Sequence, residues 1–565
     1  MLYRCWMMSS VAVLVTSSSL IAGPLAAQSA DVEPFSALVR QAQLASGGRH
    51  WANAADLWRN VVDRNPTVAS YWAELGQSLY EGGRFEESIA AYARAMELGA
   101  GYPWSSPYAI ARAQARLNRV DSALAWLDTA LRLRFRDLDQ IRNDSVFASF
   151  RSNPRFRALA AMADPKSMSR LQGWTYDVDL FDREIRRLHY SPFLRTPEPE
   201  FRAAVAALKR DLPKLSDPEI KVRLMRLATM AGDGHTTFRA VRIPDGTTAN
   251  MPMFEAAPVL LYDMSGGLYV VGSDSSHADL VGWEVIRVAG REPREVLAAI
   301  DPLVSWDNRG WIKLIAPDYA RRPGLLNALG MTRDRDSLRL RLRSADGRER
   351  DVALATDLAA SDQSWLPFPP DSSKPLYLRD RRKAYWFTYL ADSRTVYFQY
   401  NRVRPDPTES MPQFLERLFG FIDSNQVDRL VIDLRWNRGG NTFMHPPLLE
   451  RLIASKLNAT GKLFVIIGRN TFSAAQNGAT MIERMTRAVF VGEPTGSRPN
   501  FIGESIRLTL PYSGLTASIS DLYWQTSWPM DHRTWIGPTL YAPPTIEAFR
   551  TGRDPAMEAI LAYRP

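Results

Sequence analysis

Two short apolar runs rich in valine and isoleucine lie in the second half of the sequence. Leu430 to Leu434 and Leu463 to Ile467 are each bounded by polar or glycine residues. This pattern is typical of strands buried on both faces, so we expect them to be neighbours in one mostly parallel sheet. The second run leads through Thr471 to Ala475 into an apolar-periodic helix. Because open α/β sheets handle ligands at the carboxyl ends of their strands, this edge is the predicted functional region.

The chain before this region alternates between helical and strand periodicity. Residues 165–232 have helical spacing and end in the segment Gly232-Asp233-Gly234-His235-Thr236. Alternating patterns then predict strands and one helix. The expected strands are 259–261, 268–271, 284–288, 338–342, 350–354, 384–390 and 395–400, and the expected helices are 294–300 and 412–424. A stretch rich in proline and serine, 361–375, is predicted to be an extended linker.

Residues 38 to 135 repeat with the spacing of a tetratricopeptide repeat, a pair of helices whose small residues allow close packing. One unit contains Trp72, Leu75, Gly76, Gly83, Phe85, Ser88, Tyr92 and Ala95. The second helix recurs one period earlier, at Ala54, Trp58 and Val61, and one period later, at Ala123, Leu127 and Ala130. A solenoid that holds a peptide or partner protein is predicted; a plain helical bundle is the alternative.

The amino terminus has the pattern of a secretory signal peptide. Arg4 precedes an apolar run that ends in the small residues Ala26 and Ala27, which predicts export to the periplasm or the extracellular space after cleavage near Ala27. A membrane anchor is the alternative, but the run is short and interrupted by serine, threonine and proline. The only cysteine, Cys5, lies in this segment, so disulfides and thiolate metal sites are excluded from the expected mature chain.

Composition, charge and residue spacing argue against several other classes of function. The net charge of +9 arises from scattered arginines rather than from a basic stripe or a known module, which argues against nucleic-acid binding. No later stretch is long and apolar enough to span a membrane. No His/Asp/Glu cluster has ligand spacing, so neither a metal nor another cofactor is expected.

Ser473 is the candidate nucleophile, because a serine on a strand-to-helix turn projects its hydroxyl outward above a helix amino end. Two oxyanion donors are expected nearby: the backbone N–H of Ala474 and that of Gly439 or Gly440, where no side chain blocks a substrate carbonyl. A simple helix cap is the alternative role of Ser473. The hydroxyl also needs a base. Among the histidines, His50, His189, His277 and His445 are interpreted as surface or capping residues.

Several motifs together resemble those of the tail-specific, or C-terminal-processing, serine peptidases, on the branch similar to the tricorn core. They are GDGHT at 232–236, DLRWNRGG at 433–440, TFSAA at 471–475, GEPTG at 492–496 and the closing DHRTWIGPTLYAPPT. The resemblance covers residues 170 to 560. It implies a PDZ-like module at 250–300 and a crotonase-like, ClpP-related sheet. It also implies that Ser473 is the nucleophile and that Ala474 with Gly439 or Gly440 forms the oxyanion hole.

The general base separates the branches of this family. Processing peptidases use a lysine where this chain has Arg498, and a guanidinium stays protonated at accessible pH. By resemblance His235 is therefore the base, and an ordinary imidazole pKa near ~6.5 suits that role. Asp531 is the acid expected to orient it, with Glu504 and Asp233 as alternatives. His235 as a helix cap and Arg498 paired with an acid such as Glu493 remain the non-catalytic interpretations.

These observations predict a multidomain chain: a tetratricopeptide solenoid, a helical region, a PDZ-like β module and an α/β crotonase- or ClpP-like core. The expected boundaries are 1–27 signal peptide, 28–164 repeat domain, 165–245 helical region, 246–360 module with β extension, 361–379 linker and 380–565 catalytic core. The predicted function is an exported serine peptidase acting on peptides or proteins, with docking on the repeats and the module. An inactive family member that binds peptides or apolar ligands as a scaffold is the alternative.

Overall fold

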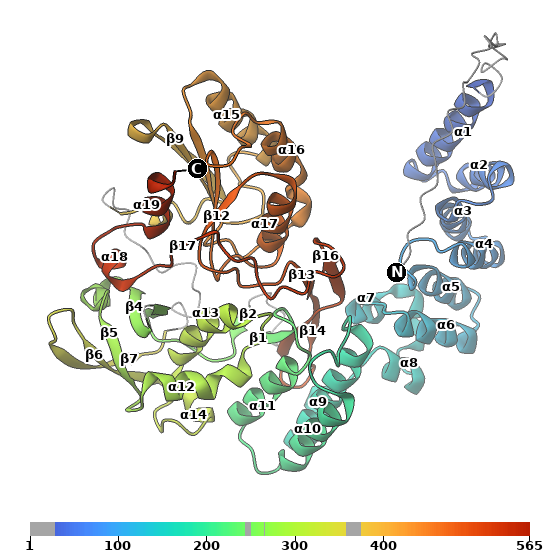
Figure 1. Cartoon of the computed structure of the whole chain (residues 1–565). Coiled ribbons are helices and arrows are strands. Elements are labelled where there is room, and N and C mark those ends of the chain that lie inside the picture. The colour runs from blue at the N-terminus through green and yellow to red at the C-terminus, as the bar shows by residue number, and fades with distance from the viewer. Residues whose placement is uncertain (1–28, 243–249, 265, 358–373, 565) are drawn as a thin grey trace, which may run out of the picture. The chain divides into compact units, whose positions relative to one another are not determined.

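The computed structural model describes residues 29–242, 250–264, 266–357 and 374–564. The chain divides into two compact units, Met1–Met162 and Ala163–Pro565 (Figure 1). The predicted signal segment 1–27 and residues 361–373 of the predicted linker lie outside the described residues. Each unit is considered by itself below.

The first unit is entirely helical in its described part, and its first six helices pack against one another in sequence order. The helices are α1 (Ser29–Gly47), α2 (Trp51–Arg64), α3 (Ala69–Glu81), α4 (Phe85–Glu97), α5 (Ser105–Arg116), α6 (Val120–Arg132), α7 (Leu138–Asn143) and α8 (Pro154–Leu159). Small residues allow α3 and α4 to approach closely: a Cβ on Gly76 would lie 3.0 Å from the Tyr92 ring, and Ser88 Oγ donates to Gly76 O at 2.8 Å. The predicted helix pairs are therefore present.

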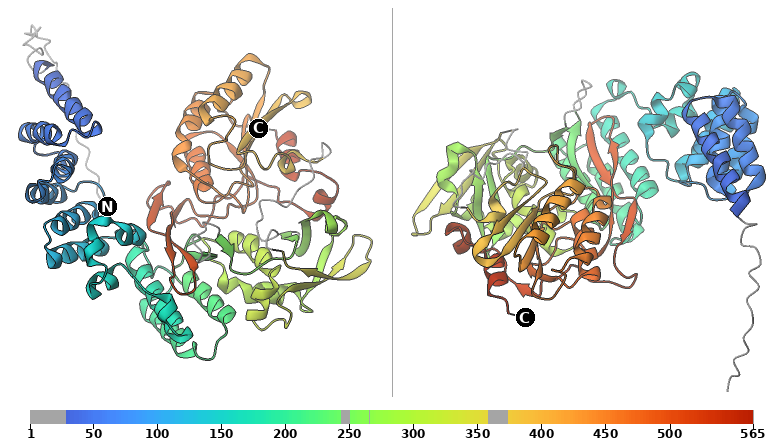
Figure 2. Two further views of the ribbon diagram at one scale, coloured as in Figure 1. Left: turned by 180° about the vertical axis from the view of Figure 1, so that it is seen from behind. Right: turned by 90° about the horizontal axis from the view of Figure 1, so that it is seen from above.

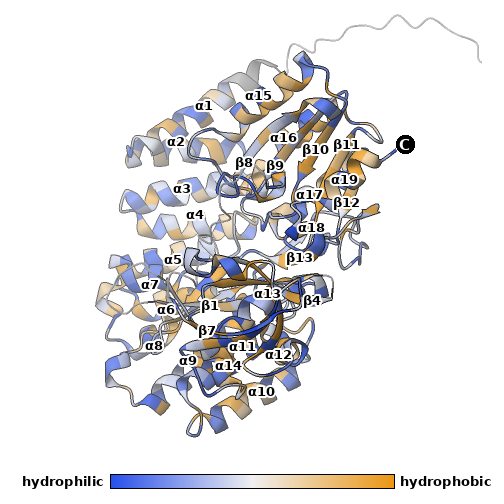
Figure 3. Ribbon diagram, turned by 90° about the vertical axis from the view of Figure 1, so that its left-hand side faces the viewer, coloured by the Kyte–Doolittle hydropathy of each residue, from blue (hydrophilic) through white to orange (hydrophobic). Residues whose placement is uncertain are grey.

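The second unit contains a six-stranded sheet in the order β17-β12-β11-β10-β9-β8. All neighbours are parallel except the β8–β9 pair. The strands are β8 (Tyr385–Leu390), β9 (Thr395–Tyr400), β10 (Arg429–Asp433), β11 (Leu463–Ile467), β12 (Val489–Gly492) and β17 (Leu540–Tyr541). Leu430 lies opposite Leu463, so the predicted pairing of the two apolar runs is confirmed. Figure 3 shows the apolar character of these central strands.

Helices cover both faces of this sheet, as the continuous apolar strands require. Leu430 and Ile432 of β10 point into a core shared with α15 (Met411–Ser424), α16 (Pro446–Ala454) and α17 (Ala474–Met485). Val431 points to the opposite face, into a core with α19 (Pro555–Ala562). The loops at the carboxyl ends of β10 and β11 carry the predicted glycine turn and Ser473.

A five-stranded antiparallel sheet with its helices forms what we call the five-stranded module, residues 256–357, coloured green to yellow in Figure 2. Its elements are β3 (Val259–Met264), β4 (Gly267–Ser273), β5 (Glu284–Val288), α12 (Pro293–Ile300), α13 (Arg309–Ala320), α14 (Pro323–Ala328), β6 (Ser337–Arg343) and β7 (Glu349–Ala355). Its hydrophobic core includes Phe472, the residue before Ser473. The module core and the loop of the predicted nucleophile are therefore continuous.

The remaining strands join segments that are far apart in sequence. β1 (Thr237–Arg242), which follows the predicted helices, pairs with β15 (Leu515–Ile519) and β2 (Asn250–Pro252), and β15 pairs with β14 (Ile506–Thr509). β13 (Asn500–Gly503) pairs with β16 (Leu522–Gln525). The helices α9 (Arg170–Leu188), α10 (Glu198–Asp211) and α11 (Asp217–Thr229) precede β1, and the short helix α18 (Ile546–Arg550) precedes α19.

Candidate functional site

Ser473 lies at the sharp turn between β11 and α17. Its backbone has φ 55° and ψ −128°, a conformation that non-glycine residues adopt rarely and that is common at functional sites. Its side chain makes no capping hydrogen bond with α17, so the interpretation of Ser473 as a simple helix cap is wrong. The side chain is partly exposed, which leaves the hydroxyl accessible for chemistry.

The glycine turn lies directly against this serine. A Cβ on Gly439 would be 2.8 Å from Ser473 Cβ and 2.7 Å from Ala474 N, so only glycine fits there. Gly439 N–H donates to Asn437 Oδ1 at 2.9 Å. The N–H groups of Gly440 and Ala474 donate no hydrogen bond to any other residue that the structure describes. Of the two predicted glycines, Gly440 is therefore the one with an uncommitted donor.

Backbone contacts tie the serine loop to the glycine turn. Phe472 N–H donates to Asn437 O at 3.2 Å, and Thr471 Oγ1 donates to Leu434 O at 3.0 Å. On the far side of the turn, Val403 N–H donates to Gly439 O at 3.0 Å. The relative position of Ser473 and the glycines is thus fixed by the ends of adjacent strands.

His235 follows α11 and is 7% exposed. The backbone N–H groups of His235 and Thr236 both donate to Asp233 Oδ1 at 2.7 Å. Asp233 also accepts from Ser520 Oγ at 2.7 Å and from His189 Nε2 at 2.8 Å. Asp233 is buried, yet His189, Ser520 and the nearby His235 hold its pKa well below the ordinary aspartate value. A buried carboxylate therefore organises the backbone that presents His235.

A second buried carboxylate holds the other side of this loop. Asp307 accepts from Gly234 N–H at 2.8 Å and from the hydroxyl of Ser497. Burial raises the pKa of Asp307 to about 6, and the neighbouring charge of Asp233 adds to the shift. Arg498 Nε donates to the Asp307 carbonyl oxygen at 3.1 Å.

The pairing of Arg498 with Glu493 is contradicted. Glu493 instead accepts from Arg469 Nε at 3.0 Å and from Arg469 Nη2 at 2.8 Å. Arg498 is held by the main chain beside the His235 loop, as described above.

Aromatic rings enclose the imidazole. The His235 ring stacks on Phe472, with ring centroids 4.5 Å apart, and on Phe501 of β13, with centroids 5.5 Å apart and planes within 6°. Phe472 in turn stacks on Trp311 of α13, with centroids 3.8 Å apart. The histidine is thus held between a ring from the serine loop and a ring from β13. Sequence patterns could not reveal this arrangement, because the rings come from segments far apart in the chain.

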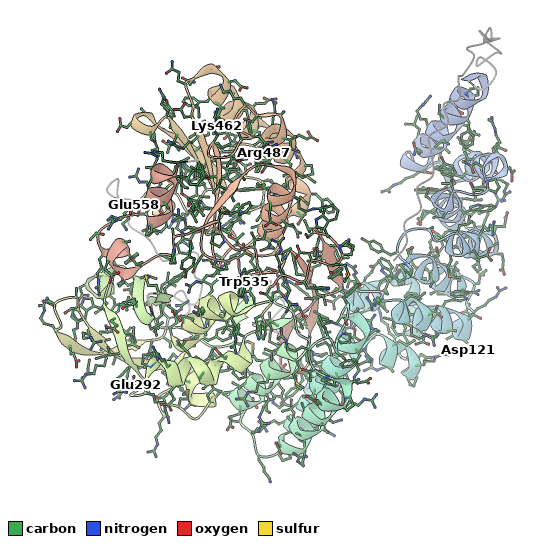
Figure 4. All side chains as sticks on the ribbon, viewed as in Figure 1. Asp121, Glu292, Lys462, Arg487, Trp535 and Glu558 are labelled. Carbon is green, nitrogen blue, oxygen red and sulfur yellow. The ribbon has the colours of Figure 1, made fainter. Side chains whose placement is uncertain are left out.

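Ser473 and His235 line the same cavity, which has a volume of about 420 Å³. No hydrogen bond joins the Ser473 hydroxyl to another residue that the structure describes. Catalytic hydrogen bonds are often long in unliganded sites and tighten when substrate binds. A larger groove of about 1070 Å³ contains neither residue. Its lining includes Glu292 and Trp535, which are labelled in Figure 4.

The three predicted acids differ in their contacts with the candidate site. Asp531 Oδ2 accepts from Ser527 Oγ at 2.6 Å, and Oδ1 accepts from Arg533 Nε at 3.0 Å. Arg533 holds the pKa of Asp531 well below the ordinary value. These contacts occupy both Asp531 oxygens and stabilise its own turn. Glu504 is exposed, in a left-handed conformation with φ 62°. Asp233 is the predicted acid that contacts His235, through the main chain.

Two histidines interpreted as surface or capping residues are in fact buried. His189 is fully buried against Asp233. His445 is 2% exposed and donates from Nε2 to Ala474 O at 2.7 Å, and burial lowers its pKa to about 4. Neutral His445 therefore anchors the start of α17 just after Ser473. Motif order alone gave no sign of this role.

Within the described ranges, no group of three or more His, Cys, Asp or Glu side chains is placed to hold a metal ion. The described helices also include none that is long and apolar enough to cross a membrane.

The similarity of this chain to known proteins lies in its structure. No model of a known protein family matches the chain, and no curated protein matches its sequence. A CPAF mutant with a serine replaced by alanine is 12% identical, with a TM-score of 0.50 over 70% of this chain and 99% of its own. The photosystem II D1 C-terminal processing protease is 12% identical, with a TM-score of 0.35 over 70% and 97% of the two chains.

The tricorn protease is 13% identical, with a TM-score of 0.33 over 70% of this chain and 36% of its own. Structural neighbours of this chain thus include processing and tricorn-type proteases. At such low identity, the likeness to CPAF shows a shared fold alone, and the chemistry must be argued from the residues of this chain.

Proposed function

We propose that this chain is a serine peptidase in which Ser473 is the nucleophile and His235 is the general base. The main support for this proposal is the strained turn that presents Ser473 at the start of α17, where Ser473 and His235 line one cavity. A strained strand-to-helix turn of this kind exposes a nucleophile and places helix N–H groups near developing negative charge.

The proposed reaction uses groups already in position. Ser473 Oγ attacks the scissile carbonyl while His235 takes its proton, and His235 then returns a proton to the leaving amine. The N–H groups of Gly440 and Ala474 would stabilise the oxyanion, because the N–H of Gly439 is engaged by Asn437. Water then takes the place of the amine: His235 removes its proton as it attacks the acyl-enzyme, and Ser473 Oγ leaves and regains a proton from His235.

Asp233 is the proposed positioning residue for His235. It accepts the backbone N–H groups of His235 and Thr236, so it fixes the loop rather than touching the reacting atoms. The contacts of Asp531 with Ser527 and Arg533 favour a structural role for that residue. Arg498 contacts the Asp307 main chain and, as a permanent cation, serves as no base.

The proposal also assigns roles to the helical first unit and to the five-stranded module. The helical first unit would dock a substrate or partner protein, in the manner of tetratricopeptide repeats, and the five-stranded module would be the PDZ-like domain. Export to the periplasm or the extracellular space follows from the signal-like segment at residues 1–27. Peptides or proteins are the proposed substrates.

A fluorophosphonate probe tests the nucleophile directly. The wild type should be labelled, and Ser473→Ala should not. His235→Gln should slow labelling and peptide hydrolysis by at least about 10³-fold, whereas the control Arg498→Lys should change both by less than about tenfold. Peptidase activity should rise with an apparent pKa near ~6.5 to 7, typical of a histidine base.

Several results would overturn the proposal. A folded wild type that stays unlabelled would favour a binding scaffold over an enzyme. Equal losses from His235→Gln and Arg498→Lys would remove His235 as the base. Circular dichroism and thermal unfolding of each variant keep a folding defect separate from a chemical one.

A further inference from the structure

A buried amide lies one turn into the helix that begins after Ser473. Asn477 of α17 is 1% exposed, and its backbone N–H donates to Ser473 O at 3.0 Å. Its side chain bonds to hydroxyls of two other segments: Nδ2 donates to Thr442 Oγ1, and Oδ1 accepts from Thr526 Oγ1, each at 2.8 Å. Both threonines are buried as well. The amide therefore fixes the positions of both partners, because leaving any of these polar groups unpaired would be costly.

Thr442 connects Asn477 to the glycine turn. It follows Gly440, the proposed oxyanion donor, by two residues. Three residues further along, His445 donates from Nε2 to Ala474 O at 2.7 Å. The segment that leaves the glycine turn is therefore attached to the first turns of α17 at two points.

Thr526 connects Asn477 to the histidine side. It directly follows β16, which pairs with β13, and both strands lie near α17 in Figure 1. Trp524 of β16 lies opposite Phe501 of β13, and the Phe501 ring stacks on His235. The bond from Thr526 thus ties α17 to the pair of strands that packs against the imidazole.

We propose that Asn477 is a positioning residue, which fixes the start of α17 relative to the Gly440 donor and to the strands beside His235. This inference rests on the proposed peptidase function. The main-chain contacts described above join the serine loop to the glycine turn, whereas the Asn477 amide reaches both the turn and the β13–β16 pair. A displacement of about 1 Å can lower the rate of a positioned reaction by about 10²-fold, so the effect belongs in kcat rather than in KM.

Matched threonine variants test this role with a fluorogenic peptide that the wild type cleaves. Thr442→Val and Thr526→Val each remove one bond to Asn477 at nearly constant volume. Each should lower kcat by about tenfold or more, with KM within about threefold of the wild type. Thr480→Val is the control: Thr480 is fully buried on the same helix, but its hydroxyl bonds only to Gln476 of α17 among the described residues. Its kcat should match the wild type.

The serine variants separate the hydrogen bond from packing. Thr442→Ser and Thr526→Ser keep the hydroxyl and should have nearly the kcat of the wild type. Losses as large as those of the valine variants would assign the effect to the methyl group and would contradict the role of the bond.

A double-mutant cycle tests whether both bonds act through the same amide. In an Asn477→Leu background, adding Thr442→Val or Thr526→Val should change kcat by less than about twofold, because the bond is already absent. A full further loss would show that the threonines act independently of Asn477. If Asn477→Leu does not fold, the valine and serine variants still decide the question.

Hydrogen exchange measured by mass spectrometry separates this inference from the peptidase proposal. The amides of residues 438–445 should exchange faster in Thr442→Val than in the wild type, and those of residues 522–528 faster in Thr526→Val. Thr480→Val should change neither region. These changes do not depend on whether the protein hydrolyses peptides.

The outcomes of labelling, kinetics and exchange are distinct. A wild type that fluorophosphonate leaves unlabelled, with the expected changes in exchange, would contradict the peptidase and support the link through Asn477. A labelled wild type whose kcat is unchanged by Thr442→Val and Thr526→Val would overturn the positioning role alone. An equal loss of kcat in Thr480→Val would overturn it as well.

Discussion

The two sides of the candidate site are built by different means. The serine side, Ser473 with the Gly439–Gly440 turn, is held by main-chain contacts between the ends of adjacent parallel strands. The histidine side, the loop at 232–236, is held by the buried carboxylates of Asp233 and Asp307. Backbone contacts do not titrate, whereas carboxylates do. The comparison teaches that the serine side should be sensitive to added volume, and the histidine side to charge and pH.

The largest expected effect is on the histidine side. Asp233→Asn replaces an acceptor for four donors by an amide that can accept through one oxygen only. Because the site is fully buried, the free energy of unfolding should fall by about 3–5 kcal/mol, measured by urea denaturation. Asp531→Asn is the matched control, and its partly exposed ion pair should cost about 1 kcal/mol or less. Equal costs for the two variants would contradict the special role of Asp233.

On the serine side, added volume should be nearly as damaging. Gly439→Ala places a Cβ 2.8 Å from Ser473 Cβ at a φ of +100°, so kcat should fall by about 10²–10³-fold. Gly420→Ala on α15 is the control, because a Cβ there meets nothing within 4 Å, and it should leave kcat unchanged. A Gly439→Ala enzyme with wild-type kcat would show that the turn does not shape the oxyanion site.

The third effect is a pH dependence of stability that arises from Asp307 on the histidine side. The pKa of Asp307 is about 6 in the folded protein, above its ordinary value of 3.8. The folded state therefore binds this proton more tightly than the unfolded chain, and stability from this group is lost as pH rises from about 4 to 6. Asp307→Asn keeps an acceptor for Gly234 but does not titrate. Its stability relative to wild type should rise over this range by on the order of 2–3 kcal/mol.

For Asp531→Asn, the same measurement should show a pH dependence of stability with the opposite sign. Arg533 lowers the pKa of Asp531, so that carboxylate stabilises the fold above its ordinary pKa and loses this contribution as pH falls below about 4. Urea denaturation of both variants and the wild type between pH 3 and 8 would check both signs. Parallel curves for the Asp307→Asn variant and the wild type would contradict the proposed titration.

The smallest effect concerns the contact between the two sides. Phe501→Leu removes one of the rings that enclose His235, an interaction of about 0.5–1.5 kcal/mol, so kcat should fall by about 2–10-fold. KM should stay near the wild-type value if Phe501 acts only by positioning His235. Phe501→Tyr should restore kcat. A loss that appears in KM instead of kcat would assign Phe501 to substrate binding.

Much of the local structure could be predicted from the sequence. The strands at 284–288, 395–400 and 463–467 have the expected bounds. Their alternating or continuous apolar patterns are local, so a few consecutive residues are enough to recognise them. The position of Ser473 on a strand-to-helix turn was predictable for the same reason. The donor choice between Gly439 and Gly440 was not, since it depends on the side chain of Asn437.

The sequence by itself determined the parts of this protein: apolar strands, a serine before a helix, a glycine turn, a histidine after a helix and a helical N-terminal region. Only the tertiary structure decided how they combine. The β1–β15 pairing brings the His235 loop beside Ser520, Asp307 comes from the segment before α13, and the α13 face meets Phe472. These contacts join residues separated by tens to hundreds of positions. Local periodicity does not encode them, because they depend on how whole elements pack.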